Sequence, residues 1–258
     1  MKEKVILVVS FGTSYPETCR KTIEKMEQAA AREFPEYEVC RAWTSGIIRR
    51  KIEKRDGIHI LSVSEAMESL HKKGVTEVVV QPTHLLNGIE NEIMNQVVEA
   101  YRVFYKSVKI GEPLLTTRED CEKLVDAMIE EWQPAEDEMV VLMGHGTEHY
   151  ADFVYAAINY RFQMKGQERM AMGTVEGYPT AEDVLKMVKK VAPKKVTLAP
   201  FMIVAGDHAS NDLAGDEDSW KCLFEREGYQ VSCVLRGLGE YEQTEQLFLG
   251  HLRAAVEG

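Results

Sequence analysis

The chain has 258 residues, of which 45% are hydrophobic and 28% charged, a composition typical of a globular protein. Its formal net charge of −11 argues against general nucleic-acid binding, which needs surplus cations to neutralise phosphates. The longest apolar runs have the length of strands, and the first residues lead into a strand without the features of a secretory signal. The five cysteines are dispersed and form no CxxC pair, as expected of reduced thiols. We therefore expect a cytoplasmic protein without membrane or nucleic-acid partners.

Strand-like and helix-like segments alternate along the first part of the chain. The continuous apolar run from Lys4 to Ser10 predicts a central parallel strand. We expect a helix after it, capped by Ser14 and with Pro16 in its first turn. Further strands are predicted over residues 37–43, 76–81 and 107–110, and helices over about 14–34, 47–55, 63–73 and 87–105.

The second part of the chain repeats this alternation, and Thr180 is expected to cap one of its helices. Strands are predicted over residues 139–143, 170–175, 195–204 and 229–235. Helices are predicted over residues 118–132, 149–163 and 180–191, over parts of 206–226, and from about 241 onward. Alternating strands and helices imply a parallel sheet covered by helices on both faces.

Corresponding strands of the two halves end in similar residues. Three segments match in the same order: 10–13 with 144–147, 42–46 with 173–177, and 81–90 with 199–208. Because chance likeness between two α/β halves is not expected to preserve this order, we favour an internal duplication. We therefore expect an α/β protein with two similar Rossmann-like lobes, residues 1–115 and 116–258, whose parallel sheets face a central cleft. We allow for the last helix to pack on the N-terminal lobe.

In the second half, three strand ends carry residue types that bind metals: His145, Glu176 and His208. His145 lies between two glycines, which allow a sharp turn and leave the imidazole accessible. Ligands of open α/β sheets bind outside the carboxyl ends of the strands, so these side chains are placed for chemistry. Two imidazoles and one carboxylate suit a divalent ion such as cobalt, iron, nickel or zinc, with coordination positions left open. The alternative is three ordinary polar loop residues, because their spacing along the chain does not require them to meet.

Four other residues near these strand ends are weaker candidates. His84 also follows a strand, but a structural role in its loop is favoured over contact with a ligand. His149 lies close to His145 in the sequence and is either a second base or a solvent-exposed helix residue. Asp207 and Asp212 flank His208 and would orient its imidazole by hydrogen bonding, as carboxylates beside metal-ligating histidines often do.

The segment from Arg41 to Arg55 holds six cations and one anion, in contrast to the acidic chain as a whole. It is either a solvated basic helix or a surface that attracts a polyanionic ligand, and the two interpretations carry equal weight. In the second interpretation, nearby hydroxyls and the start of a helix supply further donors for carboxylates. The residues predicted to bind such a ligand are Ser10, Thr13, Ser14, Thr44, Ser45, Arg49 and Arg50.

Eight segments, spread over nearly the whole chain, form a specific combination although each alone is a weak signal. They are LVVSFGTSY at 7–15, RAWTSG at 41–46, RDGI at 55–58, MGHG at 143–146, VEGYP at 175–179, VAGDHA at 204–209 with Asn211 and Asp212, DSWK at 218–221 and GLGE at 237–240. Together they resemble the anaerobic cobalt chelatases of cobalamin biosynthesis (the CbiK family), which are relatives of the protoporphyrin ferrochelatases.

The resemblance implies the chelatase fold, two facing flavodoxin-like lobes with a tetrapyrrole in the cleft, and a metal ion held by His145, Glu176 and His208. It implies a metal-inserting lyase that places Co2+, its bound substrate metal, into sirohydrochlorin, a tetrapyrrole with eight carboxylates. The sequence has no GxxxxGK[ST] phosphate loop, so neither ATP nor an organic cofactor is expected. Some relatives are exported and bind haem through a histidine in the region of His84, a role that we do not carry over to this chain.

Insertion of a divalent ion expels two pyrrole protons, so the site needs a base close to the metal. Because histidine titrates near pH ~6.5, His145 is expected to hold the ion and then accept a proton, while Glu176 relays protons outward and His208 completes the ligand set. The alternatives are a sirohydrochlorin ferrochelatase for sirohaem, a non-catalytic tetrapyrrole or metal carrier, and a zinc hydrolase. The physiological metal, the bending of the macrocycle and the formation of homo-oligomers are left open by the sequence.

Overall fold

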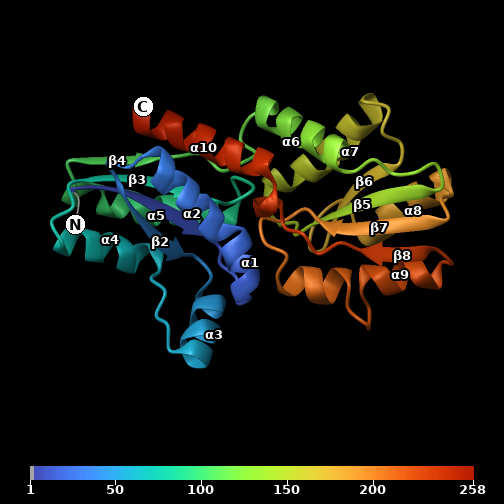
Figure 1. Cartoon of the computed structure of the whole chain (residues 1–258), viewed down its shortest axis with the longest axis horizontal. Helices are drawn as coiled ribbons and strands as arrows, with labels where there is room; N and C mark the ends of the chain where they lie inside the picture. The colour runs from blue at the N-terminus through green and yellow to red at the C-terminus, as the bar shows by residue number, and fades with distance from the viewer. Residues whose placement is uncertain (1–2) are drawn as a thin grey trace. The chain divides into compact units, whose positions relative to one another are not determined.

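The computed structural model describes residues 3–258, which form two compact α/β units (Figure 1). The first unit comprises the chain up to Thr116 together with Gly239–Gly258, and the second comprises Thr117–Leu238. The C-terminal helix α10 (Glu242–Glu257) therefore belongs to the first unit, where it contacts α2 (Ile23–Glu33) and β3 (Glu77–Pro82). Among residues 3–258, every helix falls short of the length or apolar character that a membrane crossing requires.

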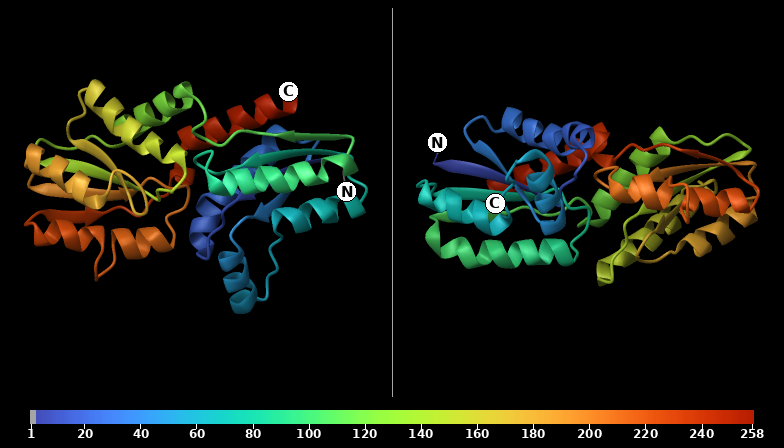
Figure 2. Two further views of the ribbon diagram at one scale, coloured as in Figure 1. Left: turned by 180° about the vertical axis from the view of Figure 1, so that it is seen from behind. Right: turned by 90° about the horizontal axis from the view of Figure 1, so that it is seen from below.

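The sheet of the first unit has four parallel strands in the order β2-β1-β3-β4. Its strands are β1 (Lys4–Ser10), β2 (Glu38–Trp43), β3 (Glu77–Pro82) and β4 (Ser107–Ile110). Besides α2 and α10, its helices are α1 (Pro16–Lys21), α3 (Gly46–Asp56), α4 (Val63–Lys72), α5 (Ile89–Tyr101) and the short turn η1 (Arg102–Phe104). Helices of this unit lie on both faces of its sheet (Figure 2).

Alternating side chains of β1 build the core of the first unit. Val5, Leu7 and Val9 point to one face, where they form a cluster with Met67 of α4 and Met94 of α5. All five residues from 5 to 9 have no exposed surface, so β1 is covered on both faces. The predicted central parallel strand is thus confirmed, and burial of branched apolar side chains on both sides stabilises it.

The second unit has the same architecture, with four parallel strands in the order β6-β5-β7-β8. Its strands are β5 (Glu138–Gly144), β6 (Met170–Thr174), β7 (Lys195–Pro200) and β8 (Gln230–Cys233). Its helices are α6 (Arg118–Glu131), α7 (Phe153–Met164), α8 (Ala181–Val191) and α9 (Trp220–Arg226), with the short turns η2 (Tyr150–Asp152) and η3 (Ala209–Leu213), and η4 (Leu238–Glu240) leads on to α10. Thr180 caps α8 as predicted, because its hydroxyl accepts the Asp183 N–H in a capping box.

The ends of corresponding strands are held in the same way in the two units. The Ser45 N–H donates to the Phe11 carbonyl at 3.2 Å, and the Glu176 N–H donates to the His145 carbonyl at 2.8 Å. The glycine that follows the first of these strands has a positive φ in both units, 103° at Gly12 and 84° at Gly146. The prediction of two similar α/β lobes with parallel sheets is therefore confirmed down to individual backbone hydrogen bonds.

The helix predicted over 14–34 is in fact two helices, α1 and α2. The break lies at Thr22, whose hydroxyl donates to the Thr18 carbonyl at 2.6 Å and whose φ and ψ of −121° and −80° are not helical. The predicted cap at Ser14 is wrong, since the N-cap residue is Tyr15 and no side chain caps α1. The Tyr15 N–H instead contacts the Thr13 hydroxyl at 3.3 Å.

One prediction in the second unit also needs correction. The strand predicted over 195–204 ends at Pro200, because the chain beyond Phe201 turns away into the loop that precedes His208. The helical segments predicted within 206–226 are confirmed as the π-helical turn η3 and the helix α9. A loop from Ala214 to Ser219 separates them.

Candidate metal centre

His145 follows β5 directly and is held by its own loop. Its Nδ1 lies 2.8 Å from the Gly146 carbonyl oxygen. Gly146 has a φ of 84°, and a Cβ at this position would lie 2.9 Å from the backbone carbon of Glu176. Only glycine adopts this conformation without strain and leaves room for the neighbouring loop. The two glycines around His145 thus serve a close approach of two loops as well as a turn.

His208 stands immediately before the π-helical turn η3, in the loop region after β7. Its Nδ1 lies 2.7 Å from a carboxylate oxygen of Asp212. π-Helical turns are rare and are found frequently at functional sites. The expectation that Asp212 hydrogen-bonds His208 is confirmed.

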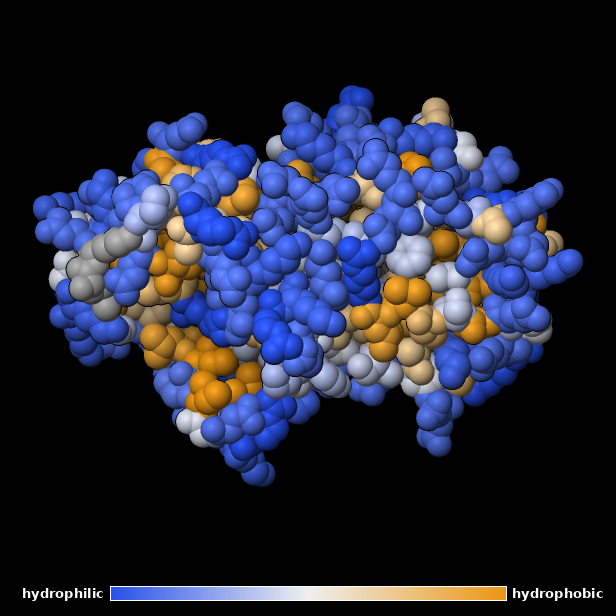
Figure 3. Space-filling view, viewed as in Figure 1, coloured by the Kyte–Doolittle hydropathy of each residue, from blue (hydrophilic) through white to orange (hydrophobic). Residues whose placement is uncertain are grey.

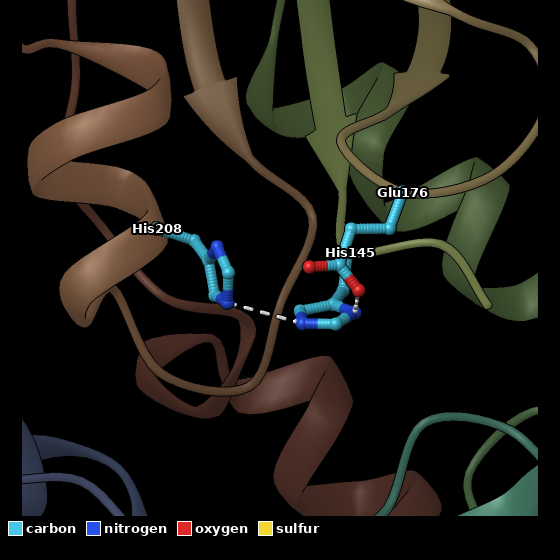
Figure 4. A group of neighbouring side chains, drawn as sticks. All are labelled: His145, Glu176 and His208. Atoms are coloured by element: carbon cyan, nitrogen blue, oxygen red, sulfur yellow. Dashed lines mark hydrogen bonds and ion pairs between the residues drawn. The ribbon is translucent and has the colours of Figure 1, made fainter.

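The hydrogen bonds at the two Nδ1 atoms fix the state of both rings. A carbonyl and a carboxylate accept hydrogen bonds, so Nδ1 of each imidazole carries a proton and donates it. In the neutral rings the lone pairs are then on the Nε2 atoms, which face each other 3.1 Å apart (Figure 4). The ring planes are nearly perpendicular, at 88°. A proton on one of the two Nε2 atoms makes this contact a hydrogen bond, and with neither protonated both lone pairs are available to a cation.

The separation of the two nitrogens fits one shared metal ion. With metal–nitrogen bonds of about 2.05 Å, a 3.1 Å separation corresponds to an angle at the metal of roughly 100°. This angle lies between the values of octahedral and tetrahedral coordination. The spacing of the two Nε2 atoms is therefore compatible with the binding of one ion.

Glu176 lies beside the two histidines in the loop after β6, and its N–H bonds the His145 carbonyl. One carboxylate oxygen is 3.9 Å from His145 Nδ1, and the ligand atoms of all three residues lie within 4.8 Å of one another. Two ligands of one ion are at most about 4.2 Å apart, so the three ligand atoms are gathered almost as closely as one bound ion would require.

The three side chains are all accessible to solvent. The exposed fraction of the side chain is 41% for His145, 59% for Glu176 and 38% for His208. An open site with three protein ligands leaves coordination positions for water or for an incoming ligand. The arrangement therefore suits an ion that must enter and leave, in contrast to a closed structural site.

His84 and His149 do not join this cluster. The Nδ1 atom of His149 accepts the Ala151 N–H at 3.2 Å and so caps the turn η2. His84 belongs to the first unit, where it is buried and its Nδ1 lies 3.3 Å from the side-chain oxygen of Asn91. Burial lowers the pKa of His84, because the charged ring would lose its hydration.

Most hydroxyls predicted to bind an anionic ligand already have partners within the first unit. Ser10 is 1% exposed and its hydroxyl accepts a hydrogen bond from Thr83 at 2.8 Å. The Ser45 hydroxyl accepts the Ile48 N–H and caps α3. Thr13 and Ser14 are buried, and Thr44 is half-buried with a hydroxyl that has no hydrogen-bond partner among the described residues.

The basic segment is partly neutralised by acidic neighbours from other parts of the first unit. Arg41 forms ion pairs with Glu24 and Glu27, and Arg49 lies 3.1 Å from Glu65. Arg55 pairs with Asp56 and also donates to the Ser14 carbonyl. Arg50 is exposed on α3, a helix that extends away from the sheet of its unit (Figure 1). The surface beside α3 combines hydrophilic side chains with an apolar patch (Figure 3).

Sequence reasoning missed one residue of the second unit, Asp152. It is buried, and each of its carboxylate oxygens accepts a backbone N–H from a different loop of the metal centre. An aspartate in the first turn of a predicted helix is read as a favourable charge at the helix N-terminus, which hides such a role. The sequence carries no signal for this role, because the contact between Gly146 and Gly177 is visible only in three dimensions.

A two-unit α/β protein with an open two-histidine, one-carboxylate centre at its strand ends has the fold and donor set of a metal-handling protein. Residues 4–257 match the family described as cobalt chelatase (CbiK). The sirohydrochlorin cobaltochelatase of Salmonella typhimurium is 38% identical over 257 residues, which cover 98% of this chain and 97% of that protein. The chain belongs to the cobalt chelatase family, and the resemblance noted in the sequence is confirmed.

A second relative supports this assignment, and a solved structure shares the fold. The sirohydrochlorin cobaltochelatase CbiKC of Nitratidesulfovibrio vulgaris is 33% identical over 265 residues, which cover 99% of this chain and 92% of that protein. The fold is similar to that of the sirohydrochlorin chelatase SirB from Bacillus subtilis subspecies spizizenii, solved in complex with cobalt. That similarity has a TM-score of 0.62 at 16% identity and covers 100% of this chain and 96% of the SirB chain.

Proposed function

We propose that this protein inserts Co2+ into sirohydrochlorin, as a metal-inserting lyase of anaerobic cobalamin biosynthesis. The observation that carries the proposal is the pair of Nε2 atoms, 3.1 Å apart, with a carboxylate beside them in a member of the cobalt chelatase family. The two relatives compared above, from Salmonella typhimurium and Nitratidesulfovibrio vulgaris, are both named sirohydrochlorin cobaltochelatases. The proposed reaction uses neither ATP nor an organic cofactor.

In the proposed reaction the ion is first bound by His145, His208 and Glu176. It then passes to the nitrogens of the macrocycle, and two pyrrole N–H protons are released as the metal–nitrogen bonds form. When the ion leaves, the Nε2 lone pair of His145 becomes free and accepts one proton. The carboxylate of Glu176 accepts the other, and because its side chain is exposed it passes protons to water.

We propose that residues of the first unit bind the carboxylates of the substrate. Arg50 is the foremost of them, because it is exposed and the structure gives it no ion pair within residues 3–258. Arg49 would exchange Glu65 for a substrate carboxylate. The proposal extends to the hydroxyl residues predicted from the sequence, Ser10, Thr13, Ser14, Thr44 and Ser45, of which Thr44 has the hydroxyl without a partner among the described residues.

The test is an anaerobic absorbance assay of purified protein with sirohydrochlorin and Co2+, Fe2+, Ni2+ or Zn2+ in separate reactions. We expect the fastest insertion with Co2+. The variants His145→Ala and His208→Ala are expected to insert metal no faster than the uncatalysed reaction, while His71→Ala, a change at an exposed histidine of α4, keeps the parental rate. Parental rates in either of the first two variants, or no acceleration by the parental protein, would disprove the proposal.

The same assay separates the alternative functions. A sirohydrochlorin ferrochelatase for sirohaem remains the second candidate, because two imidazoles and a carboxylate suit Fe2+ as well as Co2+. It predicts faster insertion of Fe2+ than of Co2+. A carrier predicts binding of metal and tetrapyrrole without turnover. We also propose that the protein is cytoplasmic, which the five free cysteines support.

A further inference from the structure

The buried carboxylate of Asp152 connects the two loops that carry His145 and Glu176. Asp152 is 8% exposed and ends the turn η2, directly before α7. One of its oxygens accepts the Thr147 N–H at 3.0 Å, two residues after His145 in the chain. The other oxygen accepts the Tyr178 N–H at 2.7 Å, two residues after Glu176.

The surroundings leave Asp152 little freedom to move. Its own N–H donates to the His149 carbonyl at 3.0 Å, which fixes its backbone against the turn η2. The carboxylate packs directly against Gly177, where a Cβ would lie 2.7 Å from the carboxylate carbon. A glycine at 177 is therefore needed for this contact, although its φ is not in the left-handed region.

The two bonds have a direct geometric consequence for the metal centre. The loop at 145–147 and the loop at 176–178 approach each other through the bond from the Glu176 N–H to the His145 carbonyl. The two bonds to Asp152 close the same two loops from the other end. With both ends fixed, the Cα atoms of His145 and Glu176 cannot separate without breaking a hydrogen bond to a buried carboxylate, and such bonds are among the stronger ones.

We propose that Asp152 is a positioning residue of the metal centre, which sets the separation of His145 and Glu176 by binding one amide in each loop. This inference deepens the proposed function and rests on it for the identity of the metal. Asp152 does not contact the ion. It determines whether Glu176 lies close enough to His145 and His208 to bind the same ion.

The variant Asp152→Asn tests this directly, because it keeps the size of the side chain. One of its two positions becomes an NH2 group, which faces a backbone N–H and cannot accept a hydrogen bond. One loop is therefore released. Residues that orient metal ligands typically change metal affinity by 10–100-fold, so we expect a Kd for Co2+ raised at least about tenfold.

A second variant perturbs the same contact without changing a charge. Gly177→Ala places a methyl group against the Asp152 carboxylate and forces the loop outward. A matched control is Asp183→Asn, which alters a carboxylate that caps α8 in the same unit. This control weakens the capping box of α8 but leaves the two loops unchanged.

The experiment titrates each folded protein with Co2+ alone and follows the visible d–d absorption, with thermal unfolding recorded in parallel. We expect Asp152→Asn and Gly177→Ala to weaken Co2+ binding and to alter the d–d spectrum, while Asp183→Asn lowers the Tm but keeps the parental affinity and spectrum. In the insertion assay, KM for Co2+ rises in the first two variants and KM for sirohydrochlorin stays unchanged.

Parental Co2+ affinity and spectrum in folded Asp152→Asn would overturn the inference. If that variant does not fold, Gly177→Ala decides the question, and parental binding in it would have the same meaning. A failure of the proposed function looks different. In that case the parental protein binds Co2+ and the variants weaken binding, but no protein accelerates insertion into sirohydrochlorin.

Discussion

Removing the carboxylate beside His208 is expected to weaken metal binding without removing a ligand. Asp212 accepts the Nδ1–H of His208 at 2.7 Å, at the short end of the range for N–H···O bonds. This bond holds the lone pair of His208 on Nε2, which faces His145. In Asp212→Ala the ring is free to rotate and to exchange tautomers, so part of the population no longer presents a lone pair to the ion.

The expected loss of Co2+ affinity follows from the solvent exposure of Asp212 and His208. Carboxylates that orient metal-ligating histidines contribute about 10–100-fold to metal affinity. The side chain of Asp212 is 42% exposed, so water replaces part of its role and the lower end of that range applies. We expect Kd for Co2+ to rise about tenfold in Asp212→Ala, equivalent to ~1.4 kcal/mol. In Asp212→Asn the amide oxygen still accepts the Nδ1–H, and the rise is about threefold or less.

The assay is a Co2+ titration followed by d–d absorption, in the absence of tetrapyrrole. Asp216→Ala is the matched control, because Asp216 is an exposed aspartate in the loop just after the π-helical turn. It is expected to bind Co2+ with the parental affinity. Parental affinity in Asp212→Ala as well would refute the reasoning, since the orientation of His208 would then not depend on this carboxylate.

Three further predictions concern a loop, a cation and a buried histidine. Gly146→Ala is expected to lose most Co2+ binding. Gly166 has a similar positive φ but open space around it, so Gly166→Ala is expected to cost about 1 kcal/mol of stability and to leave Co2+ binding intact. Equal Co2+ binding in the two variants would contradict this prediction. Arg50→Gln is expected to raise KM for sirohydrochlorin several-fold at low salt and less at high salt, and an unchanged KM at low salt would exclude a role in attraction. Burial lowers the pKa of His84, so the unfolded chain takes up a proton near pH ~6.5 that the folded chain does not. The free energy of unfolding therefore falls as the pH drops below about 6.5. Urea unfolding at pH 7.5 and 5.5 should therefore show a smaller decrease in the free energy of unfolding for His84→Gln than for the parental chain. Equal decreases would disprove a contribution of His84 to the pH dependence of stability.

Much of the fold could be predicted from the sequence, because both central strands are covered on both faces. Such strands are continuous apolar runs, as at 4–10 and 139–143, and they stand out against amphipathic helices. The two-unit organisation was visible from matching strand ends. The break at Thr22 was not predictable, because it depends on a hydroxyl that bonds a carbonyl within the helix instead of facing solvent.

The candidate site was predictable in its residues but not in its geometry. Strand order places the loops that carry His145, Glu176 and His208 at one edge of a sheet. The two Nε2 atoms face each other because His145 hydrogen-bonds Gly146 and His208 hydrogen-bonds Asp212. No periodic pattern in the sequence encodes such bonds.

The charge of the basic segment was overestimated for a related reason. Acidic partners such as Glu24, Glu27 and Glu65 lie outside the segment in sequence and reach it only in the folded unit. A count of charges along 41–55 therefore exceeds the charge that the folded surface presents.

The most direct test of the central claim is a crystal of the protein soaked in Co2+ and measured at the cobalt absorption edge. The account predicts one strong anomalous peak about 2.0–2.2 Å from Nε2 of His145 and Nε2 of His208, with a Glu176 carboxylate oxygen turned in to a similar distance. A cobalt ion bound elsewhere in the chain, with the imidazoles of His145 and His208 carrying no metal, would contradict it.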